Sequence, residues 1–278
     1  MPLGAVIEAV VATRDPAASI DFHTRAFGLE VLERDAGGAL LGVAGSPTGR
    51  LRLAAAPGVP ATPAPRIWDI GPRLLGIYSR DLERTAAAID AAGGTSRDRV
   101  TYPYGAATLS EFVALGADGV WWTIPRAGAA HRPSPALEGD ARRLHGELHT
   151  AVLVPDDHDA AVAFFTGAGG LEVLFEGEMS GDPFDRMTGM PEGASLRLTF
   201  LVARDHPPAR LEIMSFRGVD AADRTASPLG LRRLVFASDD PGATLDDLVK
   251  AGATRLDGTT LRGPAGIELQ VRHARLTP

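Results

Sequence analysis

Residues 15–32, DPAASIDFHTRAFGLEVL, return in the second half of the chain as residues 157–174, DHDAAVAFFTGAGGLEVL. Ten of these eighteen positions are identical without a gap, including the closing run GLEVL. Two further pairs follow in the same order, 81–95 with 240–254 and 117–125 with 264–272. Repetition of this kind indicates a duplicated domain, and the additional pairs indicate that each half contains two similar units.

The four units share one local pattern. A β-rich run such as 5–13 or 147–154 comes first, and an aspartate follows where a helix N-cap is expected. About ten helix-forming residues then lead to a glycine that ends the helix, and further β-rich runs complete the unit. The pattern predicts an α+β fold of four βαβββ modules. The expected caps are Asp15, Asp81, Asp156 or Asp157, and Asp239 or Asp240.

Composition narrows the class of protein. We expect two domains, residues 1–126 and 144–278, because the linker 127–143 has no apolar periodicity. The net charge of −7 argues against nucleic-acid and anionic-membrane partners, and no apolar stretch approaches the roughly 20 residues of a membrane span. The absence of cysteine excludes thiolate metal sites. With no export signal visible, a cytoplasmic location is the default expectation.

The segment HGELH, 145–149, concentrates ligand-type side chains. On a helix, His145 and His149 would share a face, as in zinc proteases. On a strand, His145, Glu147 and His149 would alternate onto one face instead. The repeat places the segment at the first strand of the third module, which favours the strand and withdraws the protease-like pairing.

This organisation resembles the vicinal oxygen chelate superfamily, which includes glyoxalase I, extradiol dioxygenases and bleomycin-resistance proteins. The resemblance rests on the βαβββ rhythm and on FGLEVL and GGLEVL after the capping aspartates. It implies modules paired into two curled-sheet domains, each sheet forming a cup. In that superfamily a divalent metal binds in the cup, held from the first strand, seven residues before the cap, and from the last strand.

In the first half, the resemblance transfers these metal positions to Glu8, Arg52, Leu74 and Thr123. Only Glu8 is a ligand type, so we expect this half to lack a metal.

In the second half, the positions fall on His149, Glu212, Arg233 and Gln270, with Thr150 and Arg232 in the neighbouring registers. We prefer His149 because strand alternation would then turn His149, Ala151 and Leu153 toward the cup. The expected metal ligands are His149, Glu212 and Gln270. Glu212 or Glu147 would move a proton, and Arg233 would bind a substrate anion.

Three functions fit this resemblance. The first is a metal-dependent lyase or isomerase of the glyoxalase or epimerase type, which stabilises an enolate on Zn, Ni, Co, Mn or Fe. The second is a resistance-type binding protein with no metal, and the third, less favoured because of Arg233, is a ring-cleaving dioxygenase. Each takes a small molecule, for which Tyr78, Tyr104 and Trp122 are the expected pocket residues. The chain is expected to be a monomer or a homodimer.

Overall fold

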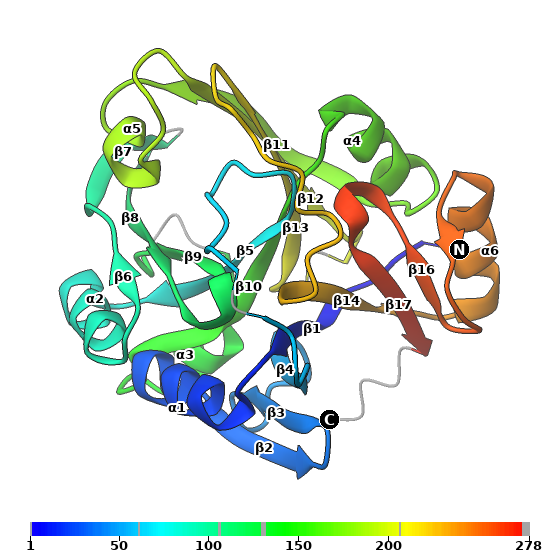
Figure 1. Ribbon diagram of the computed structural model, residues 1–278, viewed down its shortest axis with the longest axis horizontal. Coiled ribbons are helices and arrows are strands. Elements are labelled where there is room, and N and C mark those ends of the chain that lie inside the picture. The colour runs from blue at the N-terminus through cyan, green and yellow to red at the C-terminus, as the bar shows by residue number, and fades with distance from the viewer. Residues whose placement is uncertain (1, 61, 105–106, 129–131, 206, 274–278) are drawn as a thin grey trace.

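The computed structural model describes residues 2–60, 62–104, 107–128, 132–205 and 207–273. Two large curled β-sheets form the molecule, with helices packed on their outer faces (Figure 1). No helix among these residues is long and apolar enough to cross a membrane. The prediction of an α+β fold built from four βαβββ modules in two curled sheets is therefore confirmed.

Each module begins with a strand and a helix and continues with further strands. Module 1 contains β1 (Val6–Thr13), α1 (Pro16–Phe27), β2 (Glu30–Asp35), β3 (Gly38–Gly42) and β4 (Arg50–Ala55). Module 2 contains β5 (Gly71–Ser79), α2 (Leu82–Ala91), β6 (Thr95–Ser96), β7 (Val100–Tyr104), β8 (Ala107–Leu115), η1 (Ala117–Gly119) and β9 (Trp121–Pro125).

The second half repeats this order. The short helix α3 (Pro135–Gly139) lies between the halves. Module 3 contains β10 (His145–Val154), α4 (His158–Gly167), β11 (Glu172–Ser180), α5 (Phe184–Thr188), β12 (Ser195–Val202) and β13 (Arg210–Arg217). Module 4 contains β14 (Gly230–Ser238), α6 (Pro241–Lys250), β15 (Thr254–Arg255), β16 (Thr260–Arg262), η2 (Pro264–Gly266) and β17 (Glu268–His273).

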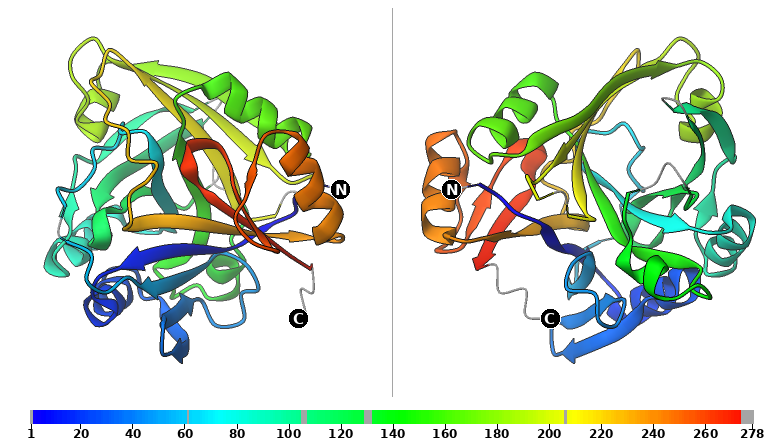
Figure 2. Two further views of the ribbon diagram at one scale, coloured as in Figure 1. Left: turned by 45° about the vertical axis from the view of Figure 1, so that its right-hand side comes forward. Right: turned by 180° about the vertical axis from the view of Figure 1, so that it is seen from behind.

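The sheets combine modules from opposite halves of the chain. β1 of module 1 pairs antiparallel with β14 of module 4, and β5 of module 2 pairs antiparallel with β10 of module 3. Figure 2 shows β1 and β14 running side by side in both views. The halves 1–126 and 144–278 are thus units of repetition, and their boundaries stay a prediction. Each cup needs one module from each half, and both cups are completed within one chain.

The expected aspartates begin the helices. Asp15, Asp81, Asp157 and Asp240 each accept a hydrogen bond from the backbone N–H three residues later, at 2.9–3.0 Å. Such a cap satisfies a backbone donor that the helix leaves free, and it typically contributes about 1 kcal/mol to stability. The identity of the third cap, Asp157 rather than Asp156, fixes the register of the candidate site below.

Two apolar clusters divide the interior. The larger lies between the helices and the outer faces of both sheets, and it includes Phe27, Trp122, Phe165 and Phe236. The smaller lies inside the cup of modules 2 and 3, and it includes Leu74, Val152, Leu198 and Met214. Because a strand alternates its side chains, membership of one cluster or the other shows which face each residue occupies.

Candidate functional site

A cavity opens inside the cup of modules 2 and 3. It encloses about 800 Å³ of unfilled space, its open mouth included. Segment 175–194, which the repeat pattern leaves as an insertion, supplies two methionines through β11 and α5. The lining is mostly apolar, which suits a small molecule with little polar surface. The apolar lining consists of Ile67, Leu74, Leu109, Val113, Pro125, Met179, Met187, Leu196, Leu198, Phe200 and Met214.

Glu212 of β13 is a buried carboxylate in the lining of this cavity. Only 5% of the residue is exposed, and Thr150 approaches one carboxylate oxygen at 3.5 Å. Burial raises the pKa of Glu212 to about 7, with the charge of Glu111 adding to the shift and Arg210 opposing it. The predicted site residue Glu212 therefore does lie in a pocket, with its proton exchangeable near neutral pH.

Glu111 of β8 is a second cavity carboxylate that the sequence analysis missed. It accepts hydrogen bonds from the Tyr102 hydroxyl and, at 3.1 Å, from the Thr123 hydroxyl. Burial raises its pKa above the usual range, and these hydrogen bonds and Arg210 only partly oppose that effect. A strand signal was present: in LSEFVAL, Glu111 alternates with Leu109 and Val113, which also line the cavity.

Arg210 supplies the cation of the cavity. Its guanidinium carbon lies 3.7 Å from the centre of the Phe200 ring, within the range of a cation–π contact. Within the described parts of the chain, its buried Nε atom has no hydrogen-bond partner. The cavity thus holds two carboxylates and one guanidinium in a mostly apolar wall.

His149 lines the cavity, but not for the reason that strand alternation suggested. Since Asp157 caps α4, the residue seven positions earlier is Thr150. Val152 packs inside the cup and Ala151 in the helix-side core, so the predicted facing of β10 was wrong by one residue. A shift in the β10–β5 register between Leu148 and Thr150 brings His149 to the cavity nevertheless.

The His149 ring packs against two residues of β5, Tyr78 and Gly76. It stacks on the Tyr78 ring with centroids 3.9 Å apart and planes 14° from parallel. A Cβ atom at Gly76 would lie 2.8 Å from Nε2 of His149, so only glycine leaves space for the imidazole here. Tyr78 also lines the cavity, and its contact with a substrate stays a prediction.

The other members of HGELH have structural contacts. Glu147 accepts a hydrogen bond from the Ser134 hydroxyl at 2.7 Å and from the Ala136 N–H at 3.3 Å, at the start of α3. His145 bonds to the Thr85 hydroxyl and the Phe27 carbonyl, and burial lowers its pKa to about 4. Glu147 does not line the cavity, which contradicts its predicted catalytic role.

Trp122 and Tyr104 are the other two aromatic residues expected in the pocket. Trp122 is fully buried in the helix-side core, with its ring centre 4.4 Å from that of Phe27, so the prediction that it contacts substrate was wrong. Tyr104 ends β7, and its side chain lies outside the described part of the structure.

Gln270 and Arg233 belong to the other cup, since β17 and β14 pair in the sheet of modules 1 and 4. Gln270 therefore does not join His149 and Glu212. Arg233 donates two hydrogen bonds to Glu268, at 2.7 and 3.0 Å, and Arg52 lies near Glu8 at 4.0 Å. The charged side chains of this cup neutralise one another instead of presenting free ligands.

The donor chemistry does not fit the expected divalent metal in either cup. Counting from the observed caps, the superfamily positions are Leu74, Thr123, Thr150 and Glu212 in one cup, and Glu8, Arg52, Arg233 and Gln270 in the other. In the first set, Glu212 is the one carboxylate, and the other positions are a hydrocarbon side chain and two neutral hydroxyl groups. In the second set, two positions carry guanidinium groups, which repel a metal cation. No cluster of three or more His, Asp or Glu suited to a metal occurs among the described residues.

Residues 6–124 match the model of the Glyoxalase/Bleomycin resistance protein/Dioxygenase superfamily. This match covers the first half of the chain. The duplication extends its βαβββ module into the second half. The predicted family is thereby confirmed, whereas no curated protein sequence matches the chain.

Solved structures of the same fold cover the whole chain. Glyoxalase I from Zea mays has a TM-score of 0.68 at 18% identity, covering 97% of this chain and 92% of its own. A putative dioxygenase from Bacillus subtilis has a TM-score of 0.61 at 11% identity, covering 97% and 85%. The cppA protein from Streptococcus pneumoniae has 0.53 at 12%, covering 98% and 100%. The TM-scores show a shared fold. At such low sequence identity the likeness extends to the fold alone, because activity depends on the residues of the site.

Proposed function

We propose that the chain binds a small, largely apolar molecule carrying a hydrogen-bond donor, in the cup of modules 2 and 3 and without a resident metal. The observation that carries the proposal is the substitution of ligand positions by Leu74, Thr123 and Thr150 around an apolar cavity. Glu212 is then the polar anchor, because a buried carboxyl group in an apolar wall gains most from a partner that hydrogen-bonds it.

The remaining side chains define the chemistry of the ligand. Glu111 already accepts two hydrogen bonds from the protein, so Glu212 is the carboxyl group with more free acceptor capacity. The methionines and Phe200 offer an adaptable surface for a flat hydrocarbon body. A phenol or an aromatic amine has this combination of an apolar body and one donor.

A pair of probes tests the proposal. We expect p-cresol to stabilise the protein against heat more than toluene does, because only the cresol hydroxyl can donate to Glu212. Glu212→Leu should abolish this preference while retaining the response to toluene, and Glu192→Gln, an exposed carboxylate, serves as the control. A chelator should change neither result. Loss of ligand stabilisation on adding chelator would refute the metal-free reading.

A metal-dependent lyase or isomerase of the glyoxalase type is the second candidate. Glu212 favours it, because it occupies a superfamily metal position and its pKa of about 7 suits a general acid or base. Turnover of the hemithioacetal of methylglyoxal and glutathione after incubation with Zn²⁺ or Ni²⁺, lost in Glu212→Gln, would establish it. The dioxygenase has less support, since His149 is the one histidine lining the cavity among the described residues.

A further inference from the structure

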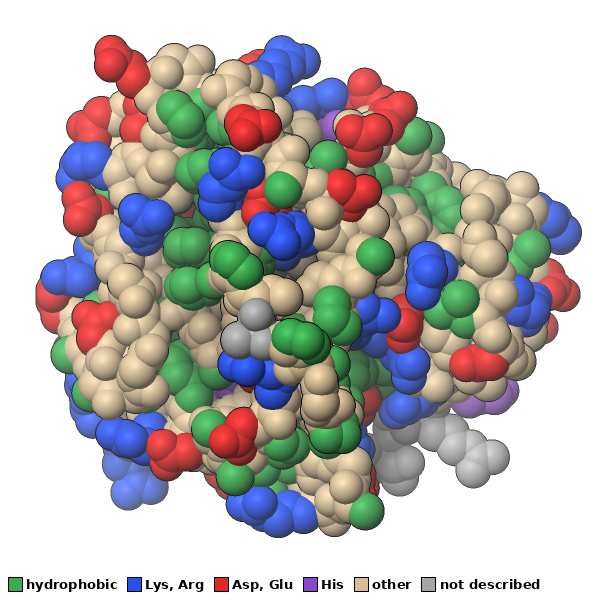
Figure 3. Space-filling view, viewed as in Figure 1, with side chains coloured by type: hydrophobic (Ala, Val, Ile, Leu, Met, Phe, Trp, Pro, Cys, Tyr) green, Lys and Arg blue, Asp and Glu red, His purple; other side chains and the backbone are tan. Residues whose placement is uncertain are grey.

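A second pocket lies outside both cups, where the two sheets meet. It encloses about 900 Å³ of unfilled space, open solvent included, and four arginines line it together with a single carboxylate, Asp118. Figure 1 shows the two connections that border it, the segment before β5 and the segment before β14, crossing the middle of one face. Basic side chains appear near the middle of this face in Figure 3. The arginines are Arg14, Arg73, Arg224 and Arg232.

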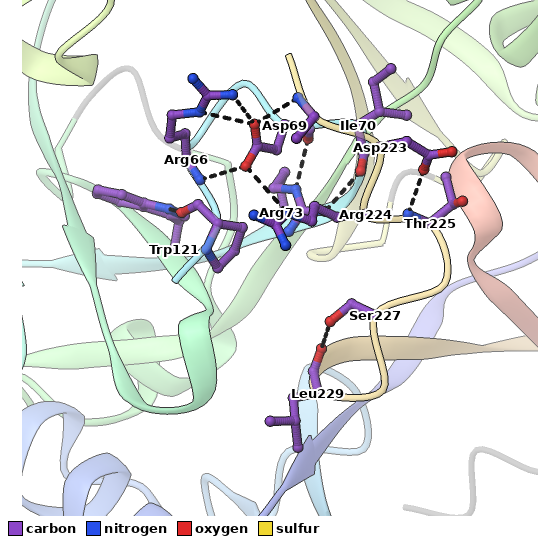
Figure 4. A network of polar contacts seen from close by, with 12 residues as sticks. Arg66, Asp69, Ile70, Arg73, Trp121, Asp223, Arg224, Thr225, Ser227 and Leu229 are labelled. Atoms are coloured by element: carbon purple, nitrogen blue, oxygen red, sulfur yellow. Dashed lines mark hydrogen bonds and ion pairs between the residues drawn. The ribbon is translucent and has the colours of Figure 1, made fainter. Parts of the chain in front are cut away.

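Arg73 is the most deeply placed of the four. Only 4% of it is exposed, and its guanidinium donates to the backbone carbonyls of Asp69, at 2.7 Å, and Ile70, at 2.9 Å (Figure 4). Carbonyl groups orient a guanidinium without neutralising its charge. The charges of Asp69 and Asp223 act on Arg73 from nearby, but they do not offset its burial. Burial accordingly lowers the pKa of Arg73 to about 10. A Cβ atom at Gly71 would lie 2.4 Å from its Nη2 atom, so glycine keeps space for the group.

Arg224 contributes a second under-neutralised cation. Its Nε atom is buried, has no hydrogen-bond partner within the described residues and lies 3.7 Å from the Asp69 carboxylate. That carboxylate already has other partners, because it pairs with Arg66 at 3.0 Å (Figure 4). It also accepts hydrogen bonds from the backbone N–H groups of Arg66 and Ala222. Asp69 therefore positions Arg224 without fully neutralising it.

The other charged side chains around the pocket do not neutralise its excess of positive charge. Arg232 pairs with Glu268 at 3.1 Å, but Glu268 is shared with Arg233. Asp118 accepts a hydrogen bond from the Ser19 hydroxyl at 2.8 Å, and burial raises its pKa although the charge of Arg14 opposes that shift. It is one carboxylate among four arginines in the lining. Positive charge therefore exceeds negative charge along a wall assembled from distant segments of the chain.

We propose that this pocket between the sheets binds a small multivalent oxyanion, an organic phosphate or a polycarboxylate, through Arg14, Arg73 and Arg224. Guanidinium groups match such anions in a bidentate geometry, and several convergent arginines select multivalent anions over chloride. The site is separate from the apolar cavity, so it concerns a different ligand from the one proposed above.

Calorimetric titration at constant ionic strength tests this site, with inorganic phosphate and succinate as probes over a chloride background. We expect at least one probe to bind the unmodified protein, and the stronger one identifies the anion class. Arg224→Gln should weaken binding about tenfold or more, since a charged hydrogen bond is lost. Arg14→Gln, at an exposed position, gives a second variant that does not depend on buried packing. Arg142→Gln, 94% exposed and outside the pocket, is the matched control.

Two results would overturn the proposal. One is the absence of phosphate and succinate binding beyond that of chloride, and the other is an equal loss in Arg142→Gln and the pocket variants. Binding of p-cresol should be unchanged in Arg224→Gln and Arg14→Gln, so a failure of this site is distinguishable from a failure of the apolar cavity.

Discussion

Replacing Glu212 by glutamine should change the stability of the protein in a pH-dependent way, in favour of the variant as the pH rises from 4.5 to about 7. The carboxyl group has a pKa of about 7 in the fold and an ordinary value of 4.5 in the unfolded chain. Above pH 4.5 the unfolded chain releases this proton while the folded protein retains it, so ionisation favours unfolding. The destabilisation grows between pH 4.5 and 7 and stays constant above. A glutamine side chain has the same shape as glutamate but does not ionise, so the variant lacks this pH-dependent loss of stability.

The size of the effect follows from the shift. Each pKa unit corresponds to about 1.4 kcal/mol, so the free energy of unfolding of Glu212→Gln should gain about 3 kcal/mol on the unmodified protein across this window. For a chain of this size that is an increase of roughly 6–12 °C in Tm. Substitution of one buried polar group by another of similar shape adds a pH-independent offset, which the comparison between pH values removes.

Denaturant unfolding at several pH values between 4.5 and 8.5 measures the difference. His145 and His23, whose pKa values burial lowers to about 4, destabilise the fold as the pH falls from 6.5, but they are present in both proteins and cancel. Glu192→Gln, an exposed substitution, should follow the unmodified protein at every pH. A stability difference for Glu212→Gln that does not change with pH would refute the reasoning.

Three further predictions concern residues whose sequence-based roles the structure changes. Trp122→Ala should lower the free energy of unfolding by about 3–5 kcal/mol, because it empties a fully buried site, while the folded variant still binds p-cresol; loss of binding at unchanged stability would restore its substrate role. Glu147→Ala should cost about 1–3 kcal/mol and speed hydrogen exchange in α3, because the Ser134 hydroxyl loses its acceptor; unaltered exchange would contradict the assignment. His145→Asn should flatten the fall of stability between pH 6.5 and 4, and an acid transition identical to that of the unmodified protein would show that His145 does not drive it.

The fold could be predicted because its signals are local and repeated. Aspartate caps, glycine ends and β-rich runs recur four times, and each acts within a few residues of chain. The pairing of modules across the halves carries no such signal. β1 and β10 have similar patterns, and only their antiparallel partners, β14 and β5, decide which modules share a cup. Placing Gln270 beside His149 failed for this reason.

The site was predictable where strand alternation is regular and failed where it is not. Glu212 lies in a regular strand and faces the cup as the alignment of RLEIM with RLRLA indicates. At His149, adjacent aspartates left the cap ambiguous, and an irregular register in β10 separates the residue from the alternation that precedes and follows it. The arginine pocket had no sequence signal, because its cations come from positions as far apart as Arg14 and Arg232.

The most direct measurement of the central claim is the metal content of the purified protein after incubation with Zn²⁺, Ni²⁺ or Mn²⁺ and dialysis, determined alongside p-cresol binding on the same sample. With Leu74, Thr123 and Thr150 around the one carboxylate at the superfamily positions of that cup, metal should remain well below one ion per chain while p-cresol binds. One tightly held ion per chain, lost together with ligand binding in Glu212→Gln, would contradict the account.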